Sequence, residues 1–390
     1  MFREKFNFTL DVSSFISMLV LCFHFINGVI GVRGVSVVTI SLIAFFELLV
    51  LLKKDTKINL RIFLLIIVVL FELIISSLRI AEASATFLYF RYFIAFSVFA
   101  MIAGSLKINV ETTVTYILHI GFVGICIYLI RGFSNYDSSI TMGISYSMLP
   151  VFFSSIIALL AYREKKIISM LCLFLCMFVF IKIAPRGIWL TSAFFIFFIL
   201  LFRMSSSKGS WVGKIGRLSV LISAFIVIWL VWENFANIII WLDSFFYNKF
   251  HISISAVKKM LFYLQKEELT NGRMRLWTIA QEYIMNEPVW GNGVGYFESL
   301  NEGAHSHNVF FQILCERGMI LGGMIFFAVY GKGLYLLVKV RNTIKIDSDY
   351  YRIFVLSCGL IMLFFSSAYW LWVPFWYSIG YMLSNNDDNA

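Results

Sequence analysis

Residues 60–78 read LRIFLLIIVVLFELIISSL and carry only two charged side chains, Arg61 and Glu72. A run of this length and composition is typical of a helix that crosses a lipid bilayer, which needs about 20 apolar residues. The chain contains about twelve such stretches, and we therefore predict an all-α, polytopic membrane protein with about twelve transmembrane helices. The other predicted spans lie near 12–30, 35–52, 87–105, 112–130, 142–161, 167–184, 188–202, 218–242, 318–338, 353–370 and 372–384.

The composition of the chain supports this class. Hydrophobic residues make up 60% of it and charged residues 14%, whereas soluble domains average about 45–50% and 25%. A soluble globular protein cannot bury that much apolar surface in one water-facing domain, so this class is excluded. We interpret the net charge of +10 as a sign of membrane topology and expect no nucleic-acid partner. The six cysteines form no CxxC pair and are expected to be buried free thiols.

The basic residues concentrate in alternate connecting segments, beginning with the N-terminal one. The positive-inside rule then predicts that both termini are cytoplasmic and that a long connection, 243–317, lies on the external side. On this basis the chain divides into N-terminal membrane helices (1–166), central membrane helices (167–242), an external loop domain (243–317) and C-terminal membrane helices (318–390).

The loop domain is expected to be structured. Apolar residues at helical spacing within 254–264 predict an amphipathic helix on the bilayer surface. A second helix is predicted for 274–286, and Pro288 ends it. The glycine-rich segment 291–295 should form a corner, and the apolar pattern resumes after Asn308.

Cationic and imidazole side chains gather on the expected external side. Guanidinium groups are the usual partners of phosphate, so these residues point to an anionic ligand. They are Arg186, Arg273, Arg275, His305 and His307.

Asn308 is a good N-cap for the helix that follows it. The start of a helix disfavours an imidazolium, so His307 should stay neutral and be able to accept a proton.

Each of these residues also has a structural interpretation. The arginines could be helix anchors or solvated loop charges, and His305 and His307 could be ordinary loop residues. Arg91 could pair with Glu72 or Glu82 or reach the external side, and Gly318-x-x-x-Gly322 could pack helices closely. We expect His24, His119 and His251 to be structural, and Asp347-Ser348-Asp349 to be a solvated face. No motif for a metal or nucleotide occurs, so we expect no metal and no cofactor.

Five segments follow one another in a fixed order: Pro185-Arg186-Gly187-Ile188-Trp189, Asn271-Gly272-Arg273-Met274-Arg275-Leu276-Trp277, PVWGNGVGYF at 288–297, His305-Ser306-His307-Asn308 and Glu316-Arg317-Gly318. Together they resemble the O-antigen polymerase and O-antigen ligase superfamily. The resemblance covers about residues 167–340.

This resemblance implies a bacterial inner-membrane glycosyltransferase of GT-C-like architecture, with a metal-independent, inverting active site that faces the periplasm. The donor would be a glycan linked to undecaprenyl pyrophosphate. Membrane lipids would surround the protein. The acceptor would be a lipid-linked repeat unit or lipid A–core, and a chain-length regulator could be a partner. Arg186 and Arg273 would bind the pyrophosphate and His307 would act as the base, with Arg275, His305 and Asn308 as possible supporting residues.

Polymerase is our first expectation and ligase the alternative. The ligase pattern is His followed by Asn, Ser or Gln, then nine residues, then Gly-x-x followed by Gly, Thr or Tyr. Here nine residues separate Asn308 from Gly318, but Leu321 stands where a small residue or Tyr is expected, and Gly322 comes one position later. A flippase or another transporter of lipid-linked oligosaccharide, and a scaffold protein, remain alternatives from other classes.

Overall fold

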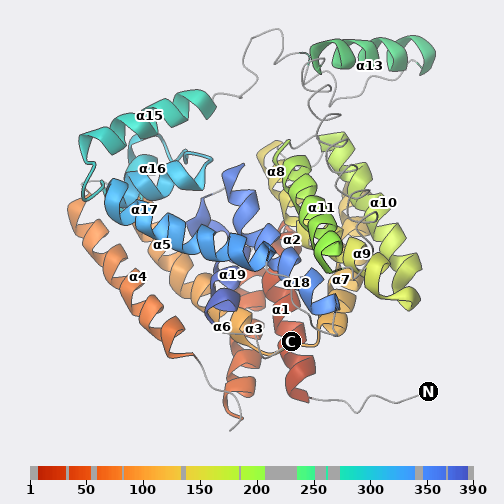
Figure 1. Cartoon of the computed structure of the whole chain (residues 1–390), viewed down its shortest axis with the longest axis horizontal. Coiled ribbons are helices and arrows are strands. Elements are labelled where there is room, and N and C mark those ends of the chain that lie inside the picture. The colour runs from red at the N-terminus through yellow and green to blue at the C-terminus, as the bar shows by residue number, and fades with distance from the viewer. Residues whose placement is uncertain are drawn as a thin grey trace.

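The structure is a computed structural model. It describes residues 8–31, 35–53, 59–80, 83–132, 138–183, 186–206, 235–250, 261, 273–338, 346–365 and 368–384. Every regular element within these ranges is helical (Figure 1). The prediction of an all-α fold is therefore confirmed for this part of the chain.

Helices cover most of the predicted apolar stretches. In chain order they are α1 (Phe8–Leu21), α2 (Phe23–Ile30), α3 (Val35–Leu51), α4 (Leu60–Arg79), α5 (Ser84–Tyr92), α6 (Val98–Ser105), α7 (Val110–Arg131), α8 (Ser138–Ser147), α9 (Leu149–Ala161), α10 (Lys166–Ile183), α11 (Arg186–Ser206), α13 (Phe235–Phe250), α15 (Arg273–Asn286), α16 (Tyr296–Leu300), α17 (Val309–Val338), α18 (Ile346–Leu356) and α19 (Val373–Leu383). A π-helical turn, Phe93–Ser97, joins α5 to α6.

Six helical segments of the described residues are long and apolar enough to cross a membrane, or seven if the bent pair α1–α2 is one span. The protein is therefore membrane-embedded. The apolar helices Val35–Leu51 and Gly187–Arg203 are shorter. Most of the predicted span 218–242 falls outside the described residues, so the count of about twelve spans stays a prediction.

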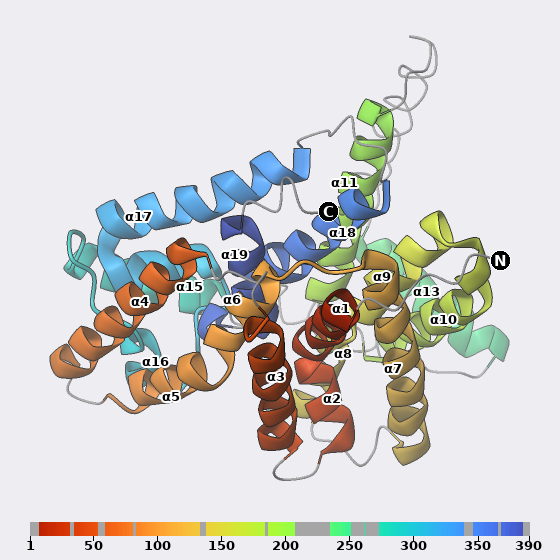
Figure 2. The same ribbon diagram turned by 90° about the horizontal axis from the view of Figure 1, so that it is seen from below.

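The helix α17 is broken rather than continuous. Gly318 has φ 74° and ψ 174°, which separates a short arm, 309–317, from a long arm, 319–338. The long arm agrees with the predicted span 318–338, and Figure 2 shows it along the upper edge of the bundle, running towards α18. A Cβ on Gly322 would lie 2.8 Å from the carbonyl oxygen of Ile313, so the two arms pack closely.

This geometry revises the interpretation of Gly318-x-x-x-Gly322. Gly322 does provide close packing, but between two arms of one helix. Gly318 instead provides the bend, because its positive φ is a backbone conformation that other residues rarely adopt.

Of the two helices predicted in the loop domain, the structure describes the second but not the first. The helix predicted for 274–286 is confirmed as α15. The amphipathic helix predicted for 254–264 lies outside the described residues except for Leu261. Upstream of it, α13 continues past residue 243, where we expected the loop to begin.

The predicted span 353–370 is not one α-helix. It passes from α18 through a π-helical turn, Ser357–Ile361, into a 3-10 turn, Met362–Phe364. A further 3-10 turn, Tyr369–Leu371, precedes α19.

Several smaller predictions are also settled. All six cysteines are free thiols and all but Cys126 are buried, as expected. His24 is structural: it stacks on Trp372 with 5.0 Å between ring centroids and accepts from the Val373 amide. The solvated face at 347–349 is wrong for Asp349, which is buried and pairs with Arg352 at 2.8 Å.

We predict that Gly318→Ala destabilises the protein by at least about 2 kcal/mol. A Cβ at this position would clash with the carbonyl of Val289, and alanine rarely adopts the positive φ. Gly323→Ala is the matched control, because a Cβ there meets nothing within 4 Å. Thermal unfolding in nanodiscs measures both variants, and equal stability of the two would contradict the role given to Gly318.

Candidate active site

The segment 305–308 forms the centre of the candidate site. His307 has a positive φ of 54°, an uncommon conformation for a residue other than glycine and one that is enriched at functional sites. The rings of His305 and His307 lie 4.1 Å apart between centroids. Between them, the Ser306 hydroxyl donates to the Asn308 carbonyl at 2.9 Å and fixes the turn.

Asn308 caps the short arm of α17, as predicted. Its side-chain oxygen accepts from the Phe310 amide at 2.9 Å, and its carbonyl accepts from the Gln312 amide at 3.1 Å. His307 therefore stands immediately before the positive end of a helix dipole.

The helix α15 brings Arg273 to the two histidines. Trp277, one turn after Arg273, donates its indole N–H to the Ser306 carbonyl at 3.0 Å and lies 5.8 Å from the Phe311 ring. Arg273 is close enough to act electrostatically on both imidazoles. Arg275 is exposed on another side of the helix.

Both histidines are neutral at ordinary pH. Burial, followed by the charge of Arg273, lowers the pKa of His307 to about 4. Burial, then His307 and then Arg273, lowers the pKa of His305 to about 3. His305 Nε2 and His307 Nδ1 are buried atoms without a hydrogen-bond partner among the described residues, and each can donate to or accept from a ligand according to its tautomer.

The glycine-rich corner fastens this unit to the membrane helices. The amide of Val294 donates to Ser76 of α4 at 3.0 Å, and its carbonyl accepts from Thr86 of α5 at 2.6 Å. The Asn292 side chain donates to the carbonyls of Tyr283 and Cys315, which joins the end of α15 to the short arm of α17.

A buried ionic cluster, which the sequence interpretation missed, closes the other end of the short arm. Arg317 binds Glu72 through two nitrogens, at 2.6 and 2.9 Å, and also contacts Glu316 at 3.0 Å. Tyr369 bonds to both Arg317 and Glu316, and Trp370 donates to Glu316 at 3.1 Å. The signal for this cluster was present, because Glu72 is a lone acid in an apolar run and ionisable groups inside a membrane are rare.

Glu72 therefore pairs with Arg317, and the predicted pair of Arg91 with Glu72 is wrong. Arg91 is exposed, and Glu82 lies outside the described residues.

The cluster extends to Glu298 of α16. Gln312 donates to Glu298 at 3.0 Å and to Glu316 at 3.2 Å. Burial raises the pKa of Glu298 to about 7, while a hydrogen bond from Tyr89 opposes that rise. The raised pKa favours the neutral form of Glu298, which limits the negative charge buried there.

The structure thus brings together Arg273, His305, His307 and Asn308. Arg186 begins α11, but its side chain lies outside the described ones, and its place in the site stays a prediction. Its neighbour Gly187 packs against Tyr146 and Phe365. No group of three or more histidine, cysteine, aspartate or glutamate side chains suited to a metal occurs among the described residues.

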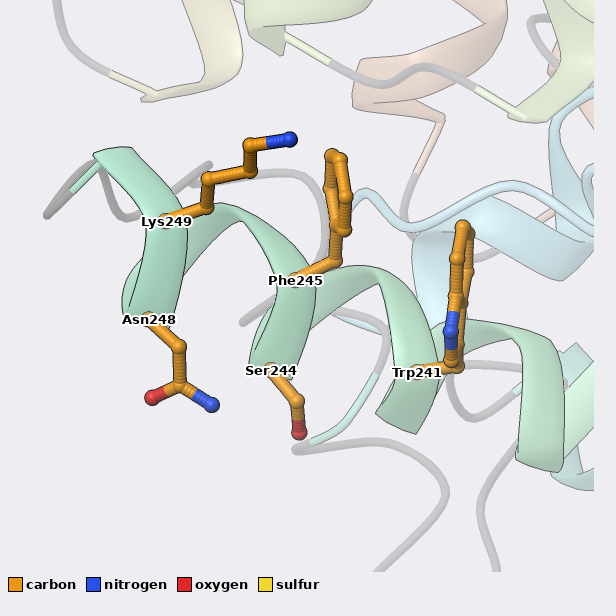
Figure 3. Close-up of a pocket in the computed structure, with 5 residues that line it drawn as sticks. All are labelled: Trp241, Ser244, Phe245, Asn248 and Lys249. Carbon is orange, nitrogen blue, oxygen red and sulfur yellow. The ribbon is translucent and has the colours of Figure 1, made fainter.

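A separate pocket on α13 contains none of these residues. Figure 3 shows Trp241, Phe245 and Lys249 on one side of the helix, with Ser244 and Asn248 on the other. The rings of Trp241 and Phe245 stack at 5.3 Å, and the Lys249 ammonium lies 5.5 Å from the Phe245 ring centroid. These contacts occupy the aromatic face of a single helix, and we assign it no part in the site.

No protein-family model matches the chain, and a search among curated proteins finds no significant match.

We predict that Arg273→Gln raises the pKa of both His305 and His307, because a nearby positive charge penalises the imidazolium form. Arg275→Gln, on the same helix, should leave both pKa values unchanged. Nuclear magnetic resonance of the protein with labelled histidine measures the titrations. Unchanged pKa values in Arg273→Gln would contradict the placement of Arg273.

Proposed function

We propose that the protein is a membrane-embedded glycosyltransferase of the O-antigen polymerase type. One observation carries the proposal: a neutral imidazole, His307, stands at a helix N-terminus within the field of a guanidinium, Arg273. A base beside a cation is the combination required to activate a hydroxyl next to an anionic leaving group.

The motif segments support the same proposal through their contacts. Trp277 touches the 305–308 turn, and the corner 291–295 touches the Glu316–Gly318 segment. Four of the five segments that resemble one family therefore contact one another, beside helices long enough to cross a bilayer, and the place of the Arg186 segment belongs to the proposal.

In the proposed reaction, a hydroxyl of the acceptor sugar donates its proton to His307. The oxygen of this acceptor hydroxyl attacks the anomeric carbon of the donor, and the bond from that carbon to the pyrophosphate oxygen breaks. The configuration inverts, and undecaprenyl pyrophosphate leaves. In this proposal Arg273 and Arg186 balance the charge that develops on the leaving group.

The ligase remains the second candidate because of Gly318. This glycine opens the Gly-x-x-Gly element of the ligase pattern and makes the bend that separates the two arms of α17. The ligase pattern restricts position 321, but here Leu321 is exposed. The close packing of the two arms instead restricts position 322, which is glycine. This departure from the pattern favours the polymerase.

A transporter is the weaker proposal. Its substrate would need a cation within the membrane region that is free to bind it. Arg317 is buried and already bound to Glu72, Glu316 and Tyr369. Arg273 lies instead at the start of α15, in the loop domain that we expect on the external side.

We predict that His307→Asn lowers glycan transfer by about 10²–10⁴-fold, the usual contribution of a general base. Asparagine is the sharpest replacement, because it tolerates the positive φ of this position and cannot accept the proton. Purified protein with a lipid-linked repeat unit provides the assay, and His119→Asn on the exposed side of α7 is the control. Full activity of His307→Asn would remove His307 from the mechanism.

We further predict that deletion of the gene in its host leaves lipopolysaccharide cores that carry a single repeat unit. A ligase deletion would instead leave bare cores and accumulate lipid-linked polymer. Gel electrophoresis of the lipopolysaccharide distinguishes the two outcomes. Unchanged polymer on the lipopolysaccharide would contradict both activities.

A further inference from the structure

The turn 288–291 lies between the ends of two apolar helices. At one side, Arg79, the last residue of α4, donates to the Gly291 carbonyl at 3.1 Å. At the other side, the amide of Met319, the first residue of the long arm of α17, donates to the Pro288 carbonyl at 2.7 Å. Val289 and Trp290 are therefore fixed at the level where both helices reach one end.

Apolar side chains at this level are exposed. Trp290 is 75% exposed and Val289 is 48% exposed. On the adjoining helix ends, Leu78 is 82% exposed and Ile320 is 60% exposed. We call this set the Trp290 surface: Leu78, Val289, Trp290, Met319 and Ile320.

The occupant of this surface follows from its continuity with the two helices. Below it, α4 exposes Phe71, Ile74 and Ile75, and α4 is long and apolar enough to cross a bilayer. The lipid that covers α4 must therefore extend to the Trp290 surface. Tryptophan is enriched where hydrocarbon meets headgroups, and the exposed Arg79 guanidinium beside it suits lipid phosphates.

We propose that the Trp290 surface inserts at the boundary between headgroups and acyl chains and so holds the α15–α16 unit against the bilayer. The lipid interface is the partner, and the proposal needs only that α4 spans the membrane. It is independent of the reaction proposed above.

One consequence concerns the buried ionic cluster. Glu72 lies seven residues before Arg79 on α4, or about 10 Å along the helix axis. If Trp290 marks the interface, the Arg317 backbone lies at that level, against Gly291, and its side chain reaches inward to Glu72. This explains why the Arg317 guanidinium is fully paired, because an unpaired charge on the hydrocarbon side of the interface would be strongly unfavourable.

Measurement of depth tests the proposal. A fluorescent label is attached to Trp290→Cys in the full chain, reconstituted in vesicles of phosphatidylethanolamine and phosphatidylglycerol. Glu282→Cys is the control, because Glu282 is also exposed but lies on the polar side of α15. The unsubstituted protein measures background labelling of the native thiols.

A lipid with a nitroxide near its headgroup should quench the label at 290 at least about twofold more than the label at 282, and aqueous iodide should show the reverse order. Equal iodide quenching at the two positions would overturn the proposal. Protection of position 290 from both quenchers would also overturn it, because another protein surface would then cover it.

A second measurement tests whether the surface holds the unit in place. Trp290→Asp should speed amide hydrogen exchange in α15 and α16 within vesicles, whereas Trp290→Tyr should not, because tyrosine also prefers the interface. Because the indole is largely exposed, neither change should disturb the core. Equal exchange in Trp290→Asp and the parent protein would overturn the anchoring role.

Discussion

The rest of the site depends on the ion pairs that the Arg317 guanidinium forms with Glu72 and Glu316. A buried guanidinium without partners would be strongly destabilising, so the surrounding chain must supply them. They come from α4, from Arg317's own helix and from the turn that holds Tyr369, three parts of the sequence that are far apart. The pair thereby fixes the short arm of α17 against the membrane helices, and the chain turns back at Gly318 immediately after it.

The candidate site lies at the opposite end of the same short arm. This helix is about 13 Å long, with the ionic cluster at its end and the Asn308 cap at its start. His307 is held in an uncommon backbone conformation by this arrangement, and Trp277 ties the turn to the helix that carries Arg273. A rigid helix with both ends fixed is suited to hold a base at a defined place beside a lipid-linked substrate.

The sequence predicts the features that depend on local chemistry. The apolar runs give most membrane helices, the spacing around Trp277 gives α15, and Asn308 gives the start of α17. Features that depend on distant partners could not be predicted. The pair of Glu72 with Arg317 joins residues 245 positions apart, and no periodicity records it. The break in 353–370 likewise depends on π-helical and 3-10 turns, which have no sequence signature as clear as proline. The approach of Arg273 to the histidines follows from the contact of Trp277 with Ser306, which is tertiary as well.

A double-mutant cycle between Arg317→Met and Glu72→Leu tests the central claim most directly, with unfolding free energy and glycan transfer as readouts. Arg317→Met should cost about 3–5 kcal/mol, because it leaves Glu72 and Glu316 without their cation, and Glu72→Leu should cost less, because Arg317 keeps Glu316 and Tyr369. The double change should cost less than the sum by about 1–3 kcal/mol and should recover part of the transfer lost in the single variants. Strictly additive losses would contradict the claim that this ion pair holds the short arm and the site at its start.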